Sequence, residues 1–495
     1  MHSKKVVVNS LFGVIYKLTT LILGFITRKI FIHYMGSELL GLNSLFTDLL
    51  SFLNLADLGI GVSVQFSLYK PLAENNEDRI VSIVNTTRNI FNVIGIGIML
   101  GGLLLTFFLD YLIANNPYDI SFLRIVFMLN VLSISLTYFI AHKKIFLQAK
   151  EEIYLVNITD TVTQLLGMIL KVFAVLLFKS YYLFVIVSIL CTLVSNIVIR
   201  KTCDKRYPYL NQTVIYPDDR KKLFLSLKDV IPLKLGMYLY TSTDNVIISS
   251  FLGLASVAAY SNYMLIINSV MQFCYMIAEA FKVSFGNLAY ETGSIEKLAK
   301  YFNTYLFLQY LMSSFCATSL LCLLDPFIRL VFGNSFVIPF SCVAALALDF
   351  FIHSLYQPLS MVFGALGKFK EDKTITLGID VVNIALSLVL IKPLGILGPI
   401  LGTLFSNTIT WIFRIYQIVY LEFKMDVKAF VWRIARYFCS FFSIILVCYW
   451  GCSCVKNREI TGFLIKIIIC AVIPNLLNLI IWYRTAEFHI LRKKS

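Results

Sequence analysis

The sequence predicts an all-α integral membrane protein with about fourteen transmembrane helices, and three observations lead to that prediction. Of the 495 residues, 58% are hydrophobic and 14% are charged, and the mean hydropathy is +0.80. A soluble domain is about 45–50% apolar and about 25% charged. The apolar residues form runs long enough to cross a bilayer, which takes about 20 residues of α-helix. Lys and Arg gather in alternate connecting segments, as on the cytoplasmic side of membrane proteins.

The apolar runs define the predicted helices in chain order. The first run is too long for the apolar core of a signal peptide, and no small-residue cleavage site follows it, so we expect it to be a retained helix. Only a few residues around Ser180 separate the fifth segment from the sixth. The first six segments are 9–33, 41–67, 82–110, 120–141, 152–178 and 181–199. The other eight are 226–250, 256–287, 301–324, 337–364, 374–392, 396–421, 431–454 and 461–483.

The basic residues predict the orientation. With the N-terminus in the cytoplasm, most of the 43 Lys and Arg residues fall in cytoplasmic segments, and residues 200–229 are especially rich in them. The opposite side holds Lys179, Arg329, Lys392, Lys456 and Arg458. Both termini are therefore predicted to be cytoplasmic. The net charge of +15 reflects this topology and not a nucleic-acid-binding surface.

The position of the longest connecting segment predicts the domain organisation. We expect an N-terminal lobe over 1–200, a cytoplasmic loop over 201–225, a C-terminal lobe over 226–424, and two further helices with a basic tail over 425–495. Two lobes of six helices are typical of transporters built from parallel repeats. Direct similarity between the halves is limited to residues 33–36 and 250–253, which precede the second and eighth helices and both end in Gly.

Charged residues within the apolar segments predict a polar cavity, because each costs about 2.5–3.5 kcal/mol on insertion scales. Lys17 and Arg28 are eleven residues apart and share one helix face. The rise per residue places Lys17 at the depth of Asp57, and Arg28 near Asp48, on the antiparallel second helix. We therefore predict two facing pairs of opposite charge. The alternative is that Arg28 and its neighbour Lys29 extend to the interface.

Other charged residues complete the candidate site. Asp349 and His353 lie four residues apart on one helix face, where they could relay protons or form a packed polar pair. The candidate substrate-binding and cavity residues are Arg28, Lys17, Lys234, Lys282, Asp57 and Asp244. The candidate coupling or pairing residues are Asp48, Asp160, Glu279, Asp349 and His353.

Patterns for catalysis or metal binding are not apparent in the sequence. The five histidines are scattered, and there is no phosphate-binding loop, H-E-x-x-H motif or long external loop. The 11 cysteines lie mostly within apolar runs and are predicted to be small buried side chains, not a disulfide framework. Cys452 and Cys454 lack metal-ligand spacing. We expect no enzyme activity, no metal and no cofactor. Coupling to H+, to Na+ or to the membrane potential is left open by the sequence.

Small residues at helical spacing predict close helix contacts. Gly97 and Gly101 occur four residues apart in the third segment, and Gly395, Gly398 and Gly402 open the twelfth.

Several motifs occur in a recognisable order. The stretch 26–42 carries Arg28 and then a Gly-containing turn, and 55–61 reads Leu-Ala-Asp-Leu-Gly-Ile-Gly. Residues 243–261 and 395–403 follow in the second half. Together they resemble the polysaccharide transporter (Wzx-type flippase) family of the multidrug/oligosaccharidyl-lipid/polysaccharide (MOP) exporter superfamily, over the whole chain.

This resemblance implies a specific fold and activity. The fold would be two six-helix lobes with two C-terminal helices outside them. The activity would be flipping of undecaprenyl-pyrophosphate-linked oligosaccharide units to the outer leaflet of the bacterial inner membrane for capsule, O-antigen or exopolysaccharide. The family has a cationic lumen and a helix 1 arginine, which Arg28 matches. Partners would be the lipid-linked oligosaccharide, a polysaccharide polymerase and a chain-length regulator.

Three other functions stay open. A lipid II flippase also has fourteen helices and cationic residues. A multidrug antiporter of the same superfamily usually has twelve helices and an acidic lumen. A membrane polysaccharide polymerase would need a large external loop or a cluster of catalytic residues, and neither is evident in the sequence.

Overall fold

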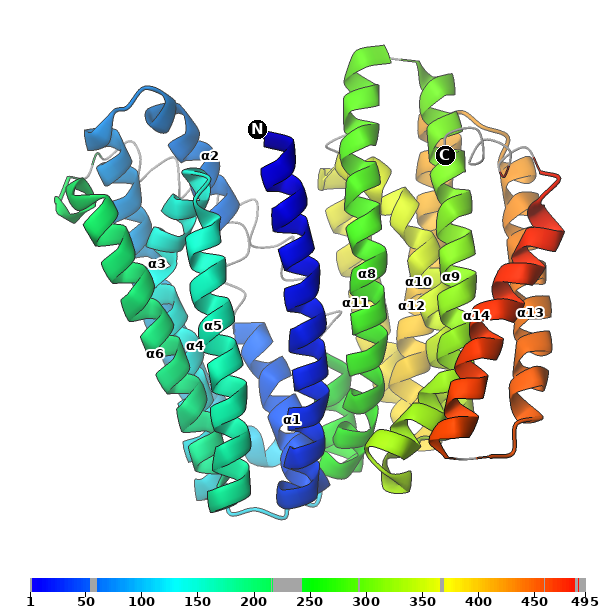
Figure 1. The fold of residues 1–495 in the computed structure, drawn as a ribbon, viewed down its shortest axis with the longest axis horizontal. Helices are drawn as coiled ribbons and strands as arrows, with labels where there is room; N and C mark the ends of the chain where they lie inside the picture. Colours follow the sequence, from blue (N-terminus) through cyan, green and yellow to red (C-terminus); the bar gives the residue numbers. More distant parts are fainter. Residues whose placement is uncertain are drawn as a thin grey trace. The chain divides into compact units, whose positions relative to one another are not determined.

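The computed structural model describes residues 2–53, 60–214, 216, 243–292, 294–365, 369–457, 459–485 and 488, and within them it consists of helices and connecting segments with no strand. The side chains of the first arm of the first helix are described from Thr20 onward. The chain packs into two compact units, Met1–Ala258 and Ala259–Ser495. Figure 1 shows the helices of both units.

The first unit contains the helices up to the start of α8. They are α1 (His2–Leu53), α2 (Ile60–Ala73), α3 (Glu77–Thr106), η2 (Leu109–Leu112), α4 (Ile120–Ala149), α5 (Ile153–Phe173), η3 (Ala174–Phe178), α6 (Tyr181–Arg206), η4 (Pro208–Asn211) and helical residues 243–252. Helix α4 is central, because it packs against α2, α3, α5 and α6.

Two glycines break helices in the same way in the two halves of the sequence. Gly36 (φ 86°, ψ 170°) divides α1 into two arms, so the first two predicted segments share one continuous element. Gly253 (φ 82°) separates residues 243–252 from α8 (Leu254–Thr292). Positive φ is readily adopted only by Gly. These glycines end the two short sequence stretches that suggested a repeat.

The fifth and sixth predicted segments are separate helices. Lys179 adopts a left-handed conformation (φ 46°), and the Ser180 side chain accepts a hydrogen bond from the Leu183 amide at the start of α6. A serine at this position stabilises a helix N-terminus by satisfying an amide that lacks a helical partner.

The start of the basic connecting segment folds back onto α3. The Asn85 side-chain amide donates to the Gln212 carbonyl at 2.7 Å, and the Tyr216 amide donates to Ser82 Oγ at 2.8 Å. Burial raises the pKa of the Tyr209 hydroxyl in this segment to about 12. The remainder of the predicted loop, and Lys234, lie outside the described residues.

The second unit contains most of α8 and the helices that follow. They are α9 (Ile295–Val331), η5 (Asn334–Phe336), α10 (Phe340–Ala365), α11 (Phe369–Leu394), α12 (Leu397–Ile415), η6 (Tyr416–Glu422), α13 (Val427–Ser453) and α14 (Ile460–Trp482). Helices α9 and α10 pack together, α12 packs against both α10 and α11, and α13 and α14 pack on α9.

A buried polar cluster holds α13 and α14 against α9. The Tyr310 hydroxyl lies 2.7 Å from Ser440 Oγ and donates to Asn478 Oδ1 at 3.1 Å. The Trp482 indole N–H lies within 3.3 Å of both hydroxyls, and the Tyr437 ring stacks on Tyr310 at 4.3 Å. Because buried polar groups are costly unless they are hydrogen-bonded, this cluster fixes the two C-terminal helices in one arrangement.

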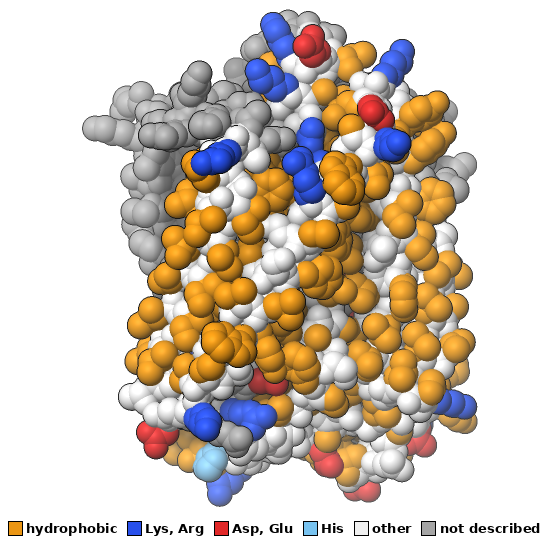
Figure 2. Space-filling model, turned by 90° about the vertical axis from the view of Figure 1, so that its right-hand side faces the viewer, with side chains coloured by type: hydrophobic (Ala, Val, Ile, Leu, Met, Phe, Trp, Pro, Cys, Tyr) orange, Lys and Arg blue, Asp and Glu red, His pale blue; other side chains and the backbone are white. Residues whose placement is uncertain are grey.

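The outer surface of α13 and α14 is apolar. Figure 2 shows hydrophobic side chains spread over this face, with Lys and Arg mostly near its two ends. Trp432 and Trp450 of α13 and Leu464 and Ile468 of α14 are among the exposed large side chains. A soluble protein would not expose so continuous an apolar surface. Of the described helices, nine are long and apolar enough to cross a membrane.

The predicted all-α membrane fold is confirmed. The predicted helix ends differ from those in the structure, and the largest difference matters for the site. The fourth segment was predicted to end at residue 141, but α4 continues to Ala149. Lys143 and Lys144 therefore belong to a packed helix and not to a loop.

Gly398 of α12 allows a very close approach to α11, as its spacing predicted. A Cβ at this position would lie 2.5 Å from the Leu390 carbonyl carbon and 2.6 Å from the Ile391 nitrogen. In the predicted pair of α3, a Cβ at Gly97 would meet no described atom within 4 Å, whereas a Cβ at Gly101 would lie 3.2 Å from Leu53 Cδ2. A tighter approach in α3 occurs at Gly102, where a Cβ would lie 2.6 Å from the Val131 methyl groups.

We expect Gly398→Ala to destabilise the protein and Gly97→Ala to leave it unchanged or slightly stabilised. The first change forces backbone atoms of two helices apart, which typically costs about 1–3 kcal/mol. The second adds a methyl group where there is space and removes about 0.5–1 kcal/mol of backbone entropy cost. Thermal unfolding of the purified variants, followed by size-exclusion chromatography, measures both. Equal melting temperatures would contradict the close packing of α11 and α12.

The predicted orientation can be tested with reporter fusions. Because Lys and Arg are concentrated in alternate connections, reporters inserted near residues 115 and 455 should report an external location and one within 200–229 a cytoplasmic location. An external signal from 200–229 would overturn the predicted topology.

Candidate functional site

The described charges of the first unit begin with Arg28 and Asp48 on the two arms of α1. Arg28 is half-buried on the first arm, and Asp48 is half-buried on the second. Asp48 Oδ2 accepts a hydrogen bond of 2.6 Å from the Asn245 side-chain amide. Asn245 follows Asp244, another candidate residue, which is also half-buried. Asp48 and Asn245, which are 197 positions apart in the chain, thus form a polar contact inside the first unit.

Asp160 of α5 takes part in a different cluster. Lys144 Nζ of α4 pairs with Asp160 Oδ2 at 3.0 Å, and Ser195 Oγ of α6 donates to Asp160 Oδ1 at 2.5 Å. Lys171 of α5 lies over the Phe184 ring, with its Nζ 5.0 Å from the centroid. Lys144 was not among the predicted site residues, because it lies beyond the predicted end of the fourth segment. The sequence signal that could have placed Lys144 in this helix was the helical spacing of the residues between it and the predicted segment.

Lys143 occupies a more buried position than its neighbour. Its side chain is only 9% exposed and forms an ion pair with Asp204 of α6. Arg200 approaches the other carboxylate oxygen of Asp204 at 3.8 Å, but its side chain is 72% exposed. The ion pairs of Lys143 and Lys144 therefore join α4 to α6 and α5.

Asp349 and His353 of α10 contact different helices. Asp349 Oδ1 accepts a hydrogen bond of 2.6 Å from the Asn407 side chain of α12. His353 Nε2 lies 2.8 Å from the Tyr275 hydroxyl of α8. Asn407 is also a hydrogen-bond partner of His353. One polar chain thus crosses from α12 through α10 to α8 within the second unit.

Arg414 of α12 is fully buried. Its guanidinium carbon lies 4.1 Å from the centroid of the Phe363 ring and 5.6 Å from that of Tyr356. Arg is weakly hydrated and stacks well on aromatic rings, so this position suits it.

The remaining candidate residues are placed only in part. Lys282 is half-buried on α8. Asp57 and Lys234 lie outside the described residues, and the side chains of Lys17 and Glu279 are likewise outside them. The predicted pairing of Lys17 with Asp57 stays a prediction.

Chemically, the described residues provide buried cations and hydrogen-bonded carboxylates inside helices that can cross a membrane. Such groups usually line a polar pathway or pair with each other. A half-buried guanidinium can bind the phosphate oxygens of a lipid carrier, and a network of carboxylate, amide, imidazole and phenol can respond to ions or protons.

The fold matches membrane transport proteins of known structure. A lipid II flippase, MurJ, in an inward closed conformation gives a TM-score of 0.70 at 16% identity, covering 96% of this chain and 99% of that chain. An inward-facing multidrug resistance MATE family transporter of the MOP superfamily gives a TM-score of 0.64 at 15% identity, covering 84% and 98%. These similarities show that the chain has the fold of these transporters, and with the nine described apolar helices they indicate a multi-pass membrane protein.

The sequence assigns the family. The model of the polysaccharide biosynthesis protein family matches residues 6–281, which is more than half of the chain, and the protein belongs to that family. No protein of curated function matches the sequence.

Proposed function

We propose that this protein is a flippase that moves undecaprenyl-pyrophosphate-linked oligosaccharide units from the cytoplasmic to the outer leaflet of a bacterial inner membrane. The observation that carries the proposal is the combination of membership in a polysaccharide biosynthesis family with a flippase-like fold over almost the whole chain. The product would supply capsule, O-antigen or exopolysaccharide synthesis.

The chemistry of the described residues supports this substrate class. A pyrophosphate carries negative charge that must be compensated in a low-dielectric environment, and Lys and Arg provide that compensation. Arg28, which matches the family's helix 1 arginine, lies half-buried on the first arm of α1. The sugars require a hydrated cavity, while the prenyl chain can remain in lipid. Alternating access would result from the rocking of one lobe, residues 1–200, against the other, residues 226–424.

The proposed protein is a transporter and not an enzyme, with both termini in the cytoplasm and helices 13 and 14 outside the two lobes. The transport cycle would draw on H+, Na+ or the membrane potential, and the Asp349–Asn407–His353–Tyr275 chain is the described network suited to sensing an ion. A polymerase and a chain-length regulator would act on the exported unit.

Deletion of the gene tests the proposal. We expect lipid-linked oligosaccharide to accumulate in the cytoplasmic leaflet, where externally added glycan-modifying enzymes do not reach it, and polymer to disappear from the surface. Re-expression of the chain should restore both. Repeat units that reach the outer leaflet but stay unpolymerised would instead indicate a polymerase.

Two further assays distinguish the proposed function from lipid II transport and from drug export. Rescue of cells depleted of their lipid II flippase would indicate lipid II as substrate. Hypersensitivity of the deletion strain to cationic drugs, with normal polymer, would indicate a multidrug antiporter.

A further inference from the structure

Four cysteines from three helices meet in the second unit. Cys322 comes from α9, Cys448 and Cys452 from α13, and Cys470 from α14. All four are buried, with at most 5% of each residue exposed. Their four Sγ atoms lie within 4.8 Å of one another. Cys470 Sγ is 3.8 Å from Cys448 Sγ and 3.8 Å from Cys452 Sγ.

These distances fit four thiolates around one metal ion. Zn²⁺ binds thiolate sulfur at about 2.3 Å in a tetrahedron, so the edges between neighbouring sulfurs are about 3.8 Å. A disulfide would require the sulfurs of a pair to approach to about 2.05 Å. One disulfide would also join only two of the four side chains, whereas all four Sγ atoms lie close to one another.

Helix geometry explains why the sequence spacing did not reveal the site. Cys448 and Cys452 are four residues apart and share one face of α13. Cys322 and Cys470 come from two helices that pack on α13, so no short motif contains them. The apolar side chains of Leu323, Ile469 and Ile473 pack against the cluster.

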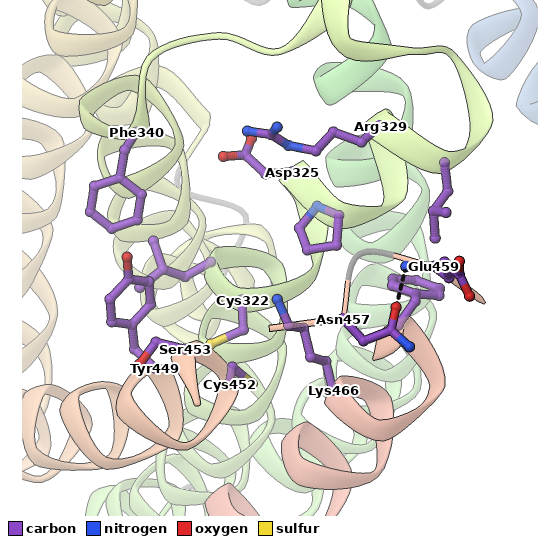
Figure 3. Close-up of a pocket in the computed structure, with 14 residues that line it drawn as sticks. Cys322, Asp325, Arg329, Phe340, Tyr449, Cys452, Ser453, Asn457, Glu459 and Lys466 are labelled. Atoms are coloured by element: carbon purple, nitrogen blue, oxygen red, sulfur yellow. Dashed lines mark hydrogen bonds between the residues drawn. The ribbon is translucent and has the colours of Figure 1, made fainter. Parts of the chain in front are cut away.

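A cavity provides access and a compensating charge. It has a volume of about 240 Å³ and is lined by Cys322 and Cys452 together with Asp325, Arg329 and Lys466. Figure 3 shows the side chain of Lys466 extending toward Cys322 and Cys452. Four thiolates around Zn²⁺ carry a net charge of −2, so a nearby ammonium reduces the cost of burying the complex.

We propose that Cys322, Cys448, Cys452 and Cys470 form a tetrahedral thiolate site for Zn²⁺. Binding converts four thiols and one Zn²⁺ into a zinc tetrathiolate and releases four protons, with no redox step. With all four positions filled by protein, the site is structural and has no open coordination position. It fastens α13 and α14 to α9 near the connection between the two C-terminal helices, twelve residues along α9 from Tyr310 and twelve residues along α14 from Trp482.

Metal analysis of the purified full-length chain tests the proposal. After purification under reducing conditions with added Zn²⁺ and removal of excess metal, we expect one zinc per chain. Replacement by Co²⁺ should give the visible absorption and thiolate charge-transfer band of tetrahedral cobalt. Cys452→Ser should reduce the retained metal at least about tenfold, and Lys466→Met should weaken retention by about 10–100-fold, as expected for loss of a supporting group.

Matched controls come from cysteines of the same unit. Cys342→Ser on α10 replaces another buried cysteine, and Cys439→Ser on α13 replaces an exposed one, and both should retain zinc. Chelation should lower the melting temperature of the wild-type chain but not of Cys452→Ser, which separates metal loss from misfolding. A monodisperse wild-type chain with four reduced thiols and no bound Zn²⁺ or Co²⁺ would overturn the proposal. Disulfides joining these four cysteines in the membrane-isolated protein would overturn it equally.

Discussion

Replacing Arg28 with Ala should abolish export of the polymer while the protein still inserts and accumulates. Arg28 lies half-buried in a helix that we predict to cross the membrane, where a charge is costly and is usually retained for a polar pathway. If this guanidinium binds the pyrophosphate of the carrier, its loss removes two-pronged hydrogen bonding that Ala cannot replace. Surface polymer, measured with a glycan-specific antibody or lectin, is the readout.

Two matched variants make the result specific. Arg28→Lys keeps the charge but not the fork of donors, so we expect partial export. Lys494→Ala removes a charge from the basic C-terminal tail and should leave export normal. Membrane abundance of each variant must equal that of the wild type. Normal polymer from Arg28→Ala would show that Arg28 extends to the interface and takes no part in transport.

The second large effect is expected at Asp204. Asp204→Ala should destabilise the protein by about 3–5 kcal/mol, because it leaves the ammonium of Lys143 buried without its carboxylate partner. Lys143 is only 9% exposed, and it lies next to the buried His142. Unfolding in mixed detergent micelles, with helix content followed by circular dichroism, measures the change in free energy.

The neighbouring residues provide the controls. Arg200→Ala removes the other cation near Asp204, but its side chain is 72% exposed, so the loss should be below about 1 kcal/mol. The double change Lys143→Met with Asp204→Leu should recover most of the stability, because it removes both buried charges together. If Asp204→Ala and Arg200→Ala had similar small effects, the Lys143–Asp204 pair would be exposed in solution and not buried.

Much of the fold follows from local features of the sequence. The apolar runs predict the helices because exposing a backbone or a charge to lipid is costly at every residue. Gly36 and Gly253 mark helix breaks because each adopts a positive φ that other residues avoid. Gly398 is small where two helices touch. Each of these properties is encoded within a few neighbouring residues, which is why it can be found from the sequence.

The candidate site was predicted less completely. Counting residues placed Asp48 at the depth of Arg28, but it did not identify Asn245 as the residue that donates to Asp48. Because the fourth segment was predicted to end at residue 141, Lys143 and Lys144 fell outside it, and their pairs with Asp204 and Asp160 were missed. An error of one residue in register rotates a side chain by about 100° around a helix of 3.6 residues per turn. The depth of a charged residue in the membrane therefore does not identify the side chain with which it pairs.

Hydropathy and basic loops were enough to recognise a multi-helix membrane protein, and the order of short motifs indicated its family. Which side chains meet depends instead on tertiary packing. Cys322 and Cys470 are separated by almost 150 residues, yet they join Cys448 and Cys452 because α9, α13 and α14 pack with those faces together. Helix formation depends on neighbouring residues, whereas the rotation and depth of each helix depend on the packing of the whole unit.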